Sequence, residues 1–149
     1  MKVITFSSLK GGTGKTSVAL QIAGKLALKN KVLIIDLDSQ KNTSLVLASE
    51  DHTDTIHDLL NDKINISDAI HNSVFKNVDF IQGSLKMSDV TVDTLTFKRK
   101  LESIYNEYDY VIFDTPPVIN SAVRSAYAVS DIVVSPIQYE LFNISNVDT

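Results

Sequence analysis

The hydrophobic positions at the start of the chain predict a strand, a helix and a second strand. The apolar run Val3–Phe6 ends in two serines and a cluster of glycines. Apolar residues then recur at helical spacing over Ser17–Leu28, which predicts a helix with a wide apolar face. The continuously apolar run Val32–Ile35 follows and ends at Asp36. Strands without polar alternation are typical of a parallel sheet that is covered on both faces.

The same succession of strands and helices continues toward the C-terminus. The stretch Glu50–Asn77 is polar and weakly patterned, and short helices are expected within it at Ile56–Leu60 and Ser67–Ile70. We predict an α/β fold with a doubly wound, mostly parallel sheet flanked by helices, formed by one domain over residues 1–149. The remaining expected elements are a strand at Phe80–Ile81, a helix at Leu95–Tyr105, a strand at Tyr110–Phe113 that ends in Asp114, a helix at Ala122–Val129, and a strand at Ile132–Val134 that leads to Pro136.

Composition narrows the class of protein. A hydrophobic content of 44% in 149 residues is enough for a core. No apolar run is long enough to span a bilayer and no N-terminal signal segment is evident, so we expect a cytoplasmic protein without a membrane role. The absence of cysteine excludes disulfides, thiolate metal sites and iron–sulfur clusters held by this chain.

The charge of the chain is mildly unfavourable for nucleic-acid binding. The net charge is −4, from 18 acidic and 14 basic residues, which is unlike a protein that coats nucleic acid through its overall charge. A local basic patch can still bind phosphates. The densest basic run, Lys98–Lys100, is a candidate for DNA contact, although such runs are more often solvated helix faces.

The first strand and the first helix are joined by a loop suited to phosphate binding. The segment Lys10–Thr16 reads KGGTGKT, and its glycines allow a tight turn that brings backbone N–H groups around a phosphate. The start of the following helix favours anions. We therefore expect this loop and the adjoining serine to bind a nucleotide; the expected binding residues are Gly11, Gly12, Thr13, Gly14, Lys15, Thr16 and Ser17. The alternative is a glycine-rich turn that binds nothing, which would not need two lysines and a threonine at these spacings.

Two acidic residues end apolar strands. The carboxyl ends of parallel strands lie at one rim of a sheet, so Asp36 and Asp114 should both face the phosphate loop. With the Thr16 hydroxyl, these carboxylates form a candidate Mg²⁺ site. The alternative for either aspartate is a helix N-cap. His52, His57 and His71 lack metal-binding spacing and are expected to be solvated.

The phosphate loop departs from the common G-x-x-x-x-G-K-[ST] pattern, because position 9 is Leu9. The K-G-G-x-G-K-T segment is a deviant Walker A motif, and with it the chain resembles the ParA/MinD family of P-loop ATPases, in particular the ParA/Soj partitioning ATPases. The resemblance implies ATP and Mg²⁺ as cofactors. It also implies that Lys10 reaches the nucleotide held by the other subunit of an ATP-bound dimer, and that Lys10 and Lys15 both have catalytic roles.

The resemblance extends to two further segments and covers residues 1 to about 138. Residues 36–40, DLDSQ, resemble the family's D-x-D-P-Q segment with Ser39 in place of proline, a change that loosens the backbone. The resemblance gives Asp38 the task of positioning the attacking water and places Asp36 near the metal. Residues 110–117, YVIFDTPP, resemble the Walker B and switch II region, where Asp114 would hold a metal-bound water and residues 115–117 would sense the γ-phosphate. Relative to the family, we expect the C-terminal part to be missing from this sequence; a truncated chain, a shortened relative and a partner chain that supplies the missing layer all remain open.

Two functions remain open at this point. The first is a slow ATPase switch for DNA (plasmid or chromosome) partitioning, in which an ATP-dependent homodimer binds DNA non-specifically, associates with the nucleoid and is stimulated by a ParB-like partner. Slow turnover is expected because no histidine or glutamate occupies an evident general-base position. The second is a catalytically degenerate nucleotide-binding or scaffold module of the same fold, or a positioning ATPase for another cargo. Ser39 and the early end of the sequence are the reasons to consider this alternative.

Overall fold

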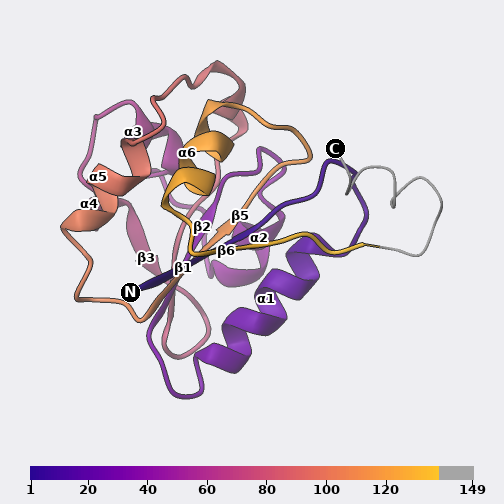
Figure 1. Ribbon diagram of the computed structural model, residues 1–149. Helices are drawn as coiled ribbons and strands as arrows, with labels where there is room; N and C mark the ends of the chain where they lie inside the picture. The colour runs from indigo at the N-terminus through magenta and orange to yellow at the C-terminus, as the bar shows by residue number, and fades with distance from the viewer. Residues whose placement is uncertain (138–149) are drawn as a thin grey trace.

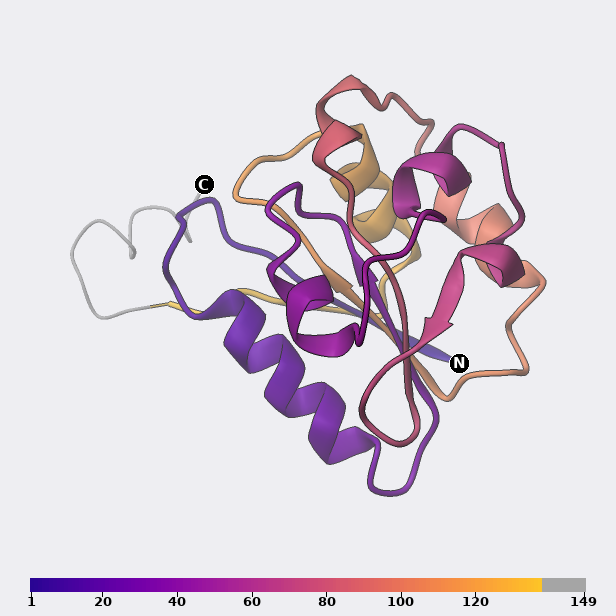
Figure 2. The same cartoon turned by 180° about the vertical axis from the view of Figure 1, so that it is seen from behind.

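The computed structural model describes residues 1–137 and contains a six-stranded sheet flanked by helices on both faces (Figures 1 and 2). The strand order is β3-β4-β2-β5-β1-β6. All neighbouring strands are parallel except β3 and β4, which are antiparallel. The predicted doubly wound α/β fold is confirmed. The strands are β1 (Lys2–Phe6), β2 (Val32–Asp36), β3 (Ile70–Asn72), β4 (Val78–Ile81), β5 (Tyr110–Asp114) and β6 (Ile132–Val134).

The helices lie in two layers. Helices α1 (Lys15–Leu26) and α2 (Asn42–Leu47) pack on one face of the sheet, and α1 runs diagonally across that face in Figure 2. The opposite face is covered by α3 (Ile56–Leu60), α4 (Ile66–Ala69), α5 (Thr96–Glu102), α6 (Ser121–Val129) and the 3₁₀ helix η1 (Leu85–Asp89). None of the described helices is both long and apolar enough to cross a membrane.

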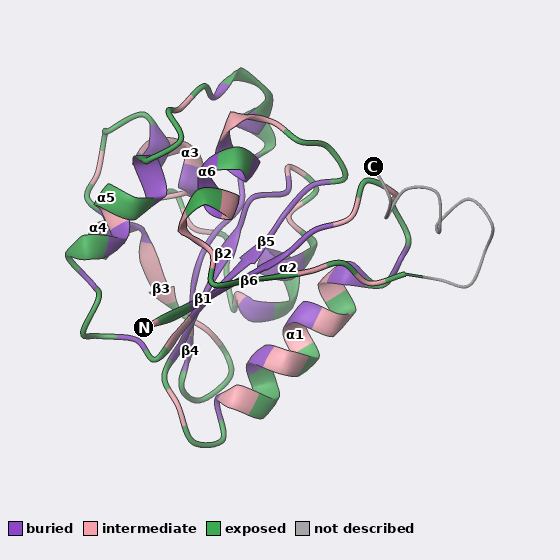
Figure 3. Cartoon of the chain, in the orientation of Figure 1, coloured by how far each residue is buried: buried purple, intermediate pink, exposed green. Residues whose placement is uncertain are grey.

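The central strands alternate between two hydrophobic cores because successive side chains of a strand point to opposite faces. In β2, Leu33 and Ile35 join the core under α3–α6, whereas Val32 and Ile34 join the core under α1. All four are at most 1% exposed. Figure 3 shows the buried central strands between partly exposed helices. This burial on both faces explains why the strands read as continuous apolar runs.

The structure confirms the predicted strands and helices, with shifts of up to three residues at their ends. The helix expected at Ser67–Ile70 is α4, which begins and ends one residue earlier, and Ile70 instead starts the antiparallel strand β3. Three elements were not predicted: α2, β3 and η1. The side chain of Phe97 is buried in the core, whereas Tyr127 is only half-buried and its hydroxyl contacts Ser7.

Candidate functional site

The loop between β1 and α1 has a backbone that requires glycine. Gly12 and Gly14 adopt positive φ angles of 75° and 81°, in the left-handed region that other residues rarely occupy. Gly14 is also the N-cap of α1, and no side chain caps the helix there. A Cβ atom built on Gly11, Gly12 or Gly14 would meet no other atom within 4 Å. Since no part of the described chain fills this space, the loop leaves room for a ligand at the helix N-terminus.

A cavity of about 340 Å³ lies at this loop. All of the nucleotide-binding residues predicted from the sequence line it, and so do Lys10 and Asp38. Asp36 and Asp114 lie behind its wall, because both are fully buried and neither lines the cavity. The lining residues are Lys10, Gly11, Gly12, Thr13, Gly14, Lys15, Thr16, Ser17, Asp38, Gln40, Asn42 and Pro117.

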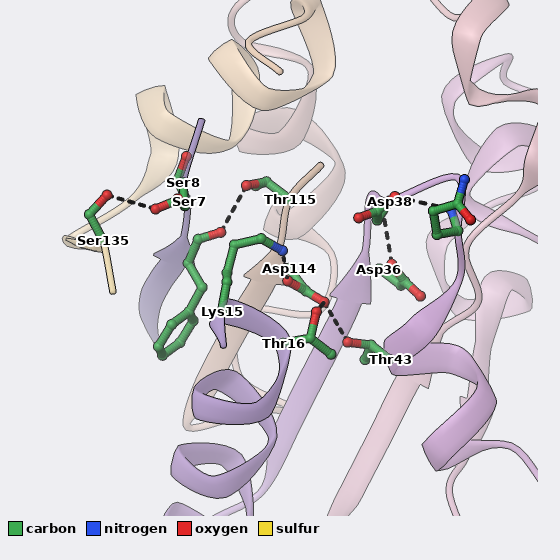
Figure 4. Close-up of polar contacts among 12 residues, drawn as sticks. Ser7, Ser8, Lys15, Thr16, Asp36, Asp38, Thr43, Asp114, Thr115 and Ser135 are labelled. Atoms are coloured by element: carbon green, nitrogen blue, oxygen red, sulfur yellow. Dashed lines mark hydrogen bonds and ion pairs between the residues drawn. The ribbon is translucent and has the colours of Figure 1, made fainter. Parts of the chain in front are cut away.

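The carboxylate of Asp114 joins three elements at the C-terminal end of the sheet (Figure 4). The ammonium of Lys15 donates to its Oδ1 at 2.5 Å. Its Oδ2 accepts from the hydroxyl of Thr16 at 2.8 Å and from the hydroxyl of Thr43 at 2.5 Å. Lys15 and Asp114 are both buried, so this ion pair sits in a low-dielectric environment where unpaired charges are costly. The structure therefore places Lys15, Thr16 and Asp114 together, as the strand-end argument predicted.

Asp36 lies on the neighbouring strand and is held by a different set of donors. Its Oδ2 accepts from the backbone N–H of Ser44 at 3.0 Å and from the Ser44 hydroxyl at 2.6 Å, and its Oδ1 accepts from the N–H of Asp38 at 3.1 Å. Burial raises the pKa of Asp36 to about 6, and the nearby charge of Asp114 adds to the rise, while the hydrogen bonds from Ser44 and Asp38 oppose it. Asp36 thus takes up its proton closer to neutral pH than an ordinary aspartate does.

Asp38 stabilises the turn that follows β2. Its Oδ1 accepts from the N–H of Gln40 at 3.0 Å, and its carbonyl accepts from the N–H of Lys41 at 3.0 Å. This side-chain turn constrains the backbone on both sides of Ser39, which stands where the family's segment has proline. The segment is therefore held by hydrogen bonds in place of a proline ring, and the carboxylate of Asp38 stays at the cavity wall.

Two loop residues have distinctive surroundings. Lys10 is half-buried and lines the cavity, and its backbone N–H and C=O both contact the hydroxyl of Ser8. Thr13 is 8% exposed, and its buried hydroxyl has no hydrogen-bond partner within residues 1–137. A buried hydroxyl without a partner is destabilising, which makes Thr13 a candidate for a contact that forms only with a ligand.

The segment after Asp114 is only partly directed at the cavity. The hydroxyl of Thr115 donates to the carbonyl of Phe6 on β1 at 2.8 Å, and Thr115 is fully buried. Pro117 alone of residues 115–117 lines the cavity. Thr115 therefore ties β5 to β1, and the exposed part of the segment begins at Pro117.

The residues around Asp114 fit a magnesium ion by their chemistry. Carboxylate and hydroxyl oxygens are the ligands that Mg²⁺ prefers, and Thr16, Asp114 and Asp36 supply them beside a cavity large enough for phosphates. Lys15 now neutralises Asp114, which a cation could do in its place. Over residues 1–137, no group of three or more histidine, aspartate or glutamate side chains is arranged to hold a metal, so this candidate site rests on two carboxylates and the Thr16 hydroxyl.

Sequence reasoning missed Thr43 and Ser44, which bind the two buried aspartates. Both residues are at most 2% exposed and lie in the first turn of α2. Because α2 has only six residues, its sequence is too short to show helical periodicity. The available signal was the pair of adjacent hydroxyl residues shortly after D-x-D, since buried carboxylates need hydrogen-bond donors.

The prediction that the histidines are solvated is only partly right, because all three are half-buried. The rings of His52 and His71 stack with their centroids 3.8 Å apart, and both contact the buried ring of Phe80. The basic run at residues 98–100 is partly neutralised, because Arg99 pairs with Asp93 and Lys100 pairs with Asp62. This pairing favours the reading of that run as a solvated helix face.

Comparison with known protein families agrees with this site. The model of the AAA domain family (AAA_31) matches residues 1–149. The virulence plasmid ParA family protein of Chlamydia psittaci is 33% identical over 156 residues, covering 97% of this chain and 60% of that protein. The chain spans about 60% of the length of the curated relatives that it matches first.

Solved structures share the fold as well. A plasmid partition protein from Borrelia burgdorferi B31, bound to AMPPNP, has a TM-score of 0.90 and 30% identity, covering 99% of this chain and 67% of that one. The septum site-determining protein MinD from Pyrococcus horikoshii OT3, complexed with Mg-ADP, has a TM-score of 0.84 and 28% identity, covering 97% of this chain and 61% of that one.

Proposed function

Because the chain belongs to the AAA domain family and, within it, to the ParA/MinD-type deviant Walker A ATPases, we propose that it binds ATP with Mg²⁺ and acts as a slow ATPase switch in DNA partitioning. Residues 1–149 would form a single P-loop ATPase domain. The observation that carries this proposal is the cluster of Lys15, Thr16 and Asp114 beside a glycine-lined cavity at a helix N-terminus.

Nucleotide binding is supported by what the loop offers to a triphosphate. The uncapped start of α1 presents backbone N–H groups, and the glycines leave space in front of them. Lys15 would exchange the carboxylate of Asp114 for phosphate oxygens, so one charge-assisted contact replaces another. The partition protein from Borrelia burgdorferi that binds AMPPNP shares this fold.

The magnesium ion would be held by Thr16 together with the carboxylates of Asp114 and Asp36, directly or through water. When bound, such an ion neutralises phosphate charge and orients the terminal phosphate for attack. MinD from Pyrococcus horikoshii, complexed with Mg-ADP, shares the fold. Release of Asp114 by Lys15 would leave this carboxylate to the metal site.

Hydrolysis would depend on positioning, because no side chain at the cavity is an evident strong base. Asp38 lines the cavity, and its Oδ1 accepts a hydrogen bond from the N–H of Gln40. The carboxylate held in this way would position an attacking water. Lys10, at the cavity rim, would stabilise phosphate charge across a dimer interface. Positioning and electrostatics without a tuned base suit a slow timer.

The cellular role is proposed from the family. An ATP-bound homodimer would bind DNA non-specifically, and a ParB-like centromere-binding partner would stimulate hydrolysis and release it. The protein would work in the cytoplasm, associated with the nucleoid, with a plasmid or chromosome as cargo. Its net charge of −4 means that DNA contact would need a local basic surface.

Calorimetry with ATP and GTP in Mg²⁺, read alongside light scattering, tests the proposal. Lys15→Ala should weaken ATP binding by at least about 100-fold, because its ammonium makes charge-assisted contacts with phosphate. Lys10→Ala should bind ATP normally but fail to dimerise and turn over. Lys25→Ala is the matched control for Lys15→Ala, because Lys25 is an exposed lysine of the same helix, α1. Absence of heat from any nucleoside triphosphate in the folded wild-type chain would refute the proposal.

A further inference from the structure

The carboxylate of Asp114 has a donor that does not belong to the phosphate loop. Lys15 and Thr16 both come from the loop and the start of α1, whereas Thr43 comes from α2 and reaches Asp114 Oδ2 at 2.5 Å. Thr43 is 1% exposed, so its hydroxyl has no access to bulk water. Figure 4 shows Thr43 approaching Asp114 from the side opposite Lys15.

The two oxygens of Asp114 have different partners. Oδ1 is bound by Lys15, and Oδ2 is bound by the hydroxyls of Thr16 and Thr43. If Lys15 moves to a phosphate, Oδ1 loses its partner while Oδ2 can keep both hydroxyls. A carboxylate held through one oxygen by two donors has a fixed plane and presents its other oxygen in a defined direction.

We propose that Thr43 is a positioning residue that aligns Asp114 Oδ1 with the magnesium site when Lys15 binds the nucleotide. This inference rests on the proposed function and adds a role for α2 to it. A hydroxyl contact from outside the phosphate loop makes the direction of Oδ1 independent of where Lys15 points.

Thr43 is itself held in place by its neighbour Ser44. The Ser44 hydroxyl donates to Asp36 and accepts from the N–H of Gly83 at 2.9 Å, which ties α2 to β2 and to the residue two positions after β4. The backbone N–H of Ser44 also donates to Asp36. The first turn of α2 is thus fastened to the strand beside β5, so the Thr43 hydroxyl is presented to Asp114 from a rigid base.

The alternative role for Thr43 is purely structural: its hydroxyl satisfies a buried acid and nothing more. The two roles differ in one measurable respect. A structural hydroxyl contributes to the stability of the ligand-free protein and leaves the effect of Mg²⁺ on nucleotide affinity unchanged. A positioning hydroxyl contributes to that effect of Mg²⁺ specifically.

The test measures AMPPNP affinity by calorimetry in Mg²⁺ and in EDTA, together with the melting temperature of the ligand-free protein. Thr43→Val removes the hydroxyl with little change of shape, Thr43→Ser keeps it, and Thr94→Val makes the same change at an exposed site. We expect Thr43→Val to reduce the gain in affinity caused by Mg²⁺ by about tenfold or more, with affinity in EDTA unchanged. Thr43→Ser should restore the gain, and Thr94→Val should keep it.

The outcomes separate this inference from the proposed function. If wild-type protein gains affinity with Mg²⁺ and Thr43→Val gains as much, Thr43 does not position Asp114, whatever happens to the melting temperature. If Thr43→Val lowers affinity equally in Mg²⁺ and EDTA, the role is structural and the inference is overturned. If wild-type protein binds AMPPNP in neither buffer, the proposed function itself fails.

Discussion

The buried carboxyl of Asp36 should make the ligand-free fold more stable at mildly acidic pH. Burial raises the pKa of Asp36 from 3.8 to about 6 in the folded protein. The folded state therefore binds a proton more tightly than the unfolded state does. The stabilisation by protonated Asp36 is fully present below about pH 4 and is lost as pH rises through about 6.

The size of this effect follows from the two pKa values. Between about pH 7.5 and about pH 5.5, proton linkage at a group with these folded and unfolded pKa values adds about 0.8 kcal/mol to the free energy of unfolding. Asp36→Asn removes the titrating group, so this part of the pH dependence should disappear even though the variant loses part of its hydrogen bonding to Ser44.

Urea unfolding in EDTA at the two pH values measures the difference. All other ionisable groups are present in both proteins, so their contribution cancels when variant and wild type are compared. Ser44→Ala provides a second check, because it removes the hydrogen bond that most lowers the pKa of Asp36 and should extend the pH dependence to higher pH. Equal pH dependence in wild type and Asp36→Asn would show that Asp36 does not titrate in this range.

Two further substitutions test the phosphate loop and the helix that follows it. Thr13→Val should raise the stability of the ligand-free protein by about 1 kcal/mol, because it removes a buried hydroxyl that has no partner within residues 1–137. It should also weaken nucleotide binding, because that hydroxyl is then lost to the ligand. Thermal melts with and without ATP measure both effects, and an unchanged melting temperature without ATP would contradict the first. Gly24→Ala should stabilise the fold by about 0.5–1 kcal/mol, because Gly24 lies inside α1 with open space around an added Cβ. Urea unfolding measures this change, and a loss of stability would contradict the prediction.

The fold was predictable where burial is complete. The central strands β1, β2 and β5 are covered on both faces, so their apolar runs mark their bounds to within a residue. Strand β3 was not predictable, because it has three half-exposed or exposed residues and pairs antiparallel at the sheet edge. The apolar pattern that reveals a strand depends on buried residues, and a three-residue edge strand such as β3 has none.

The candidate site, too, was predictable only in part. The phosphate loop was predictable because its chemistry lies in consecutive residues, and the strand-end rule brought Asp36 and Asp114 to one rim. The hydroxyls that bind these aspartates were not predictable, since nothing in the residues Thr43 and Ser44 says which carboxylate each will meet. That information lies in how α2 folds back against the sheet.

The place of β5 in the sheet bears on how the protein is made. Strands β1 and β2 are synthesised first, but they are not neighbours, because β5 lies between them and pairs with both. A nascent chain that does not yet contain Tyr110–Asp114 therefore has the glycine loop, but its strand β1 has no β5 to pair with. Such a chain also lacks Asp114, the partner of Lys15. Such distant pairings close late, so the proposed nucleotide binding would await the emergence of β5 from the ribosome. Premature termination before this strand would leave a product unable to assemble the site.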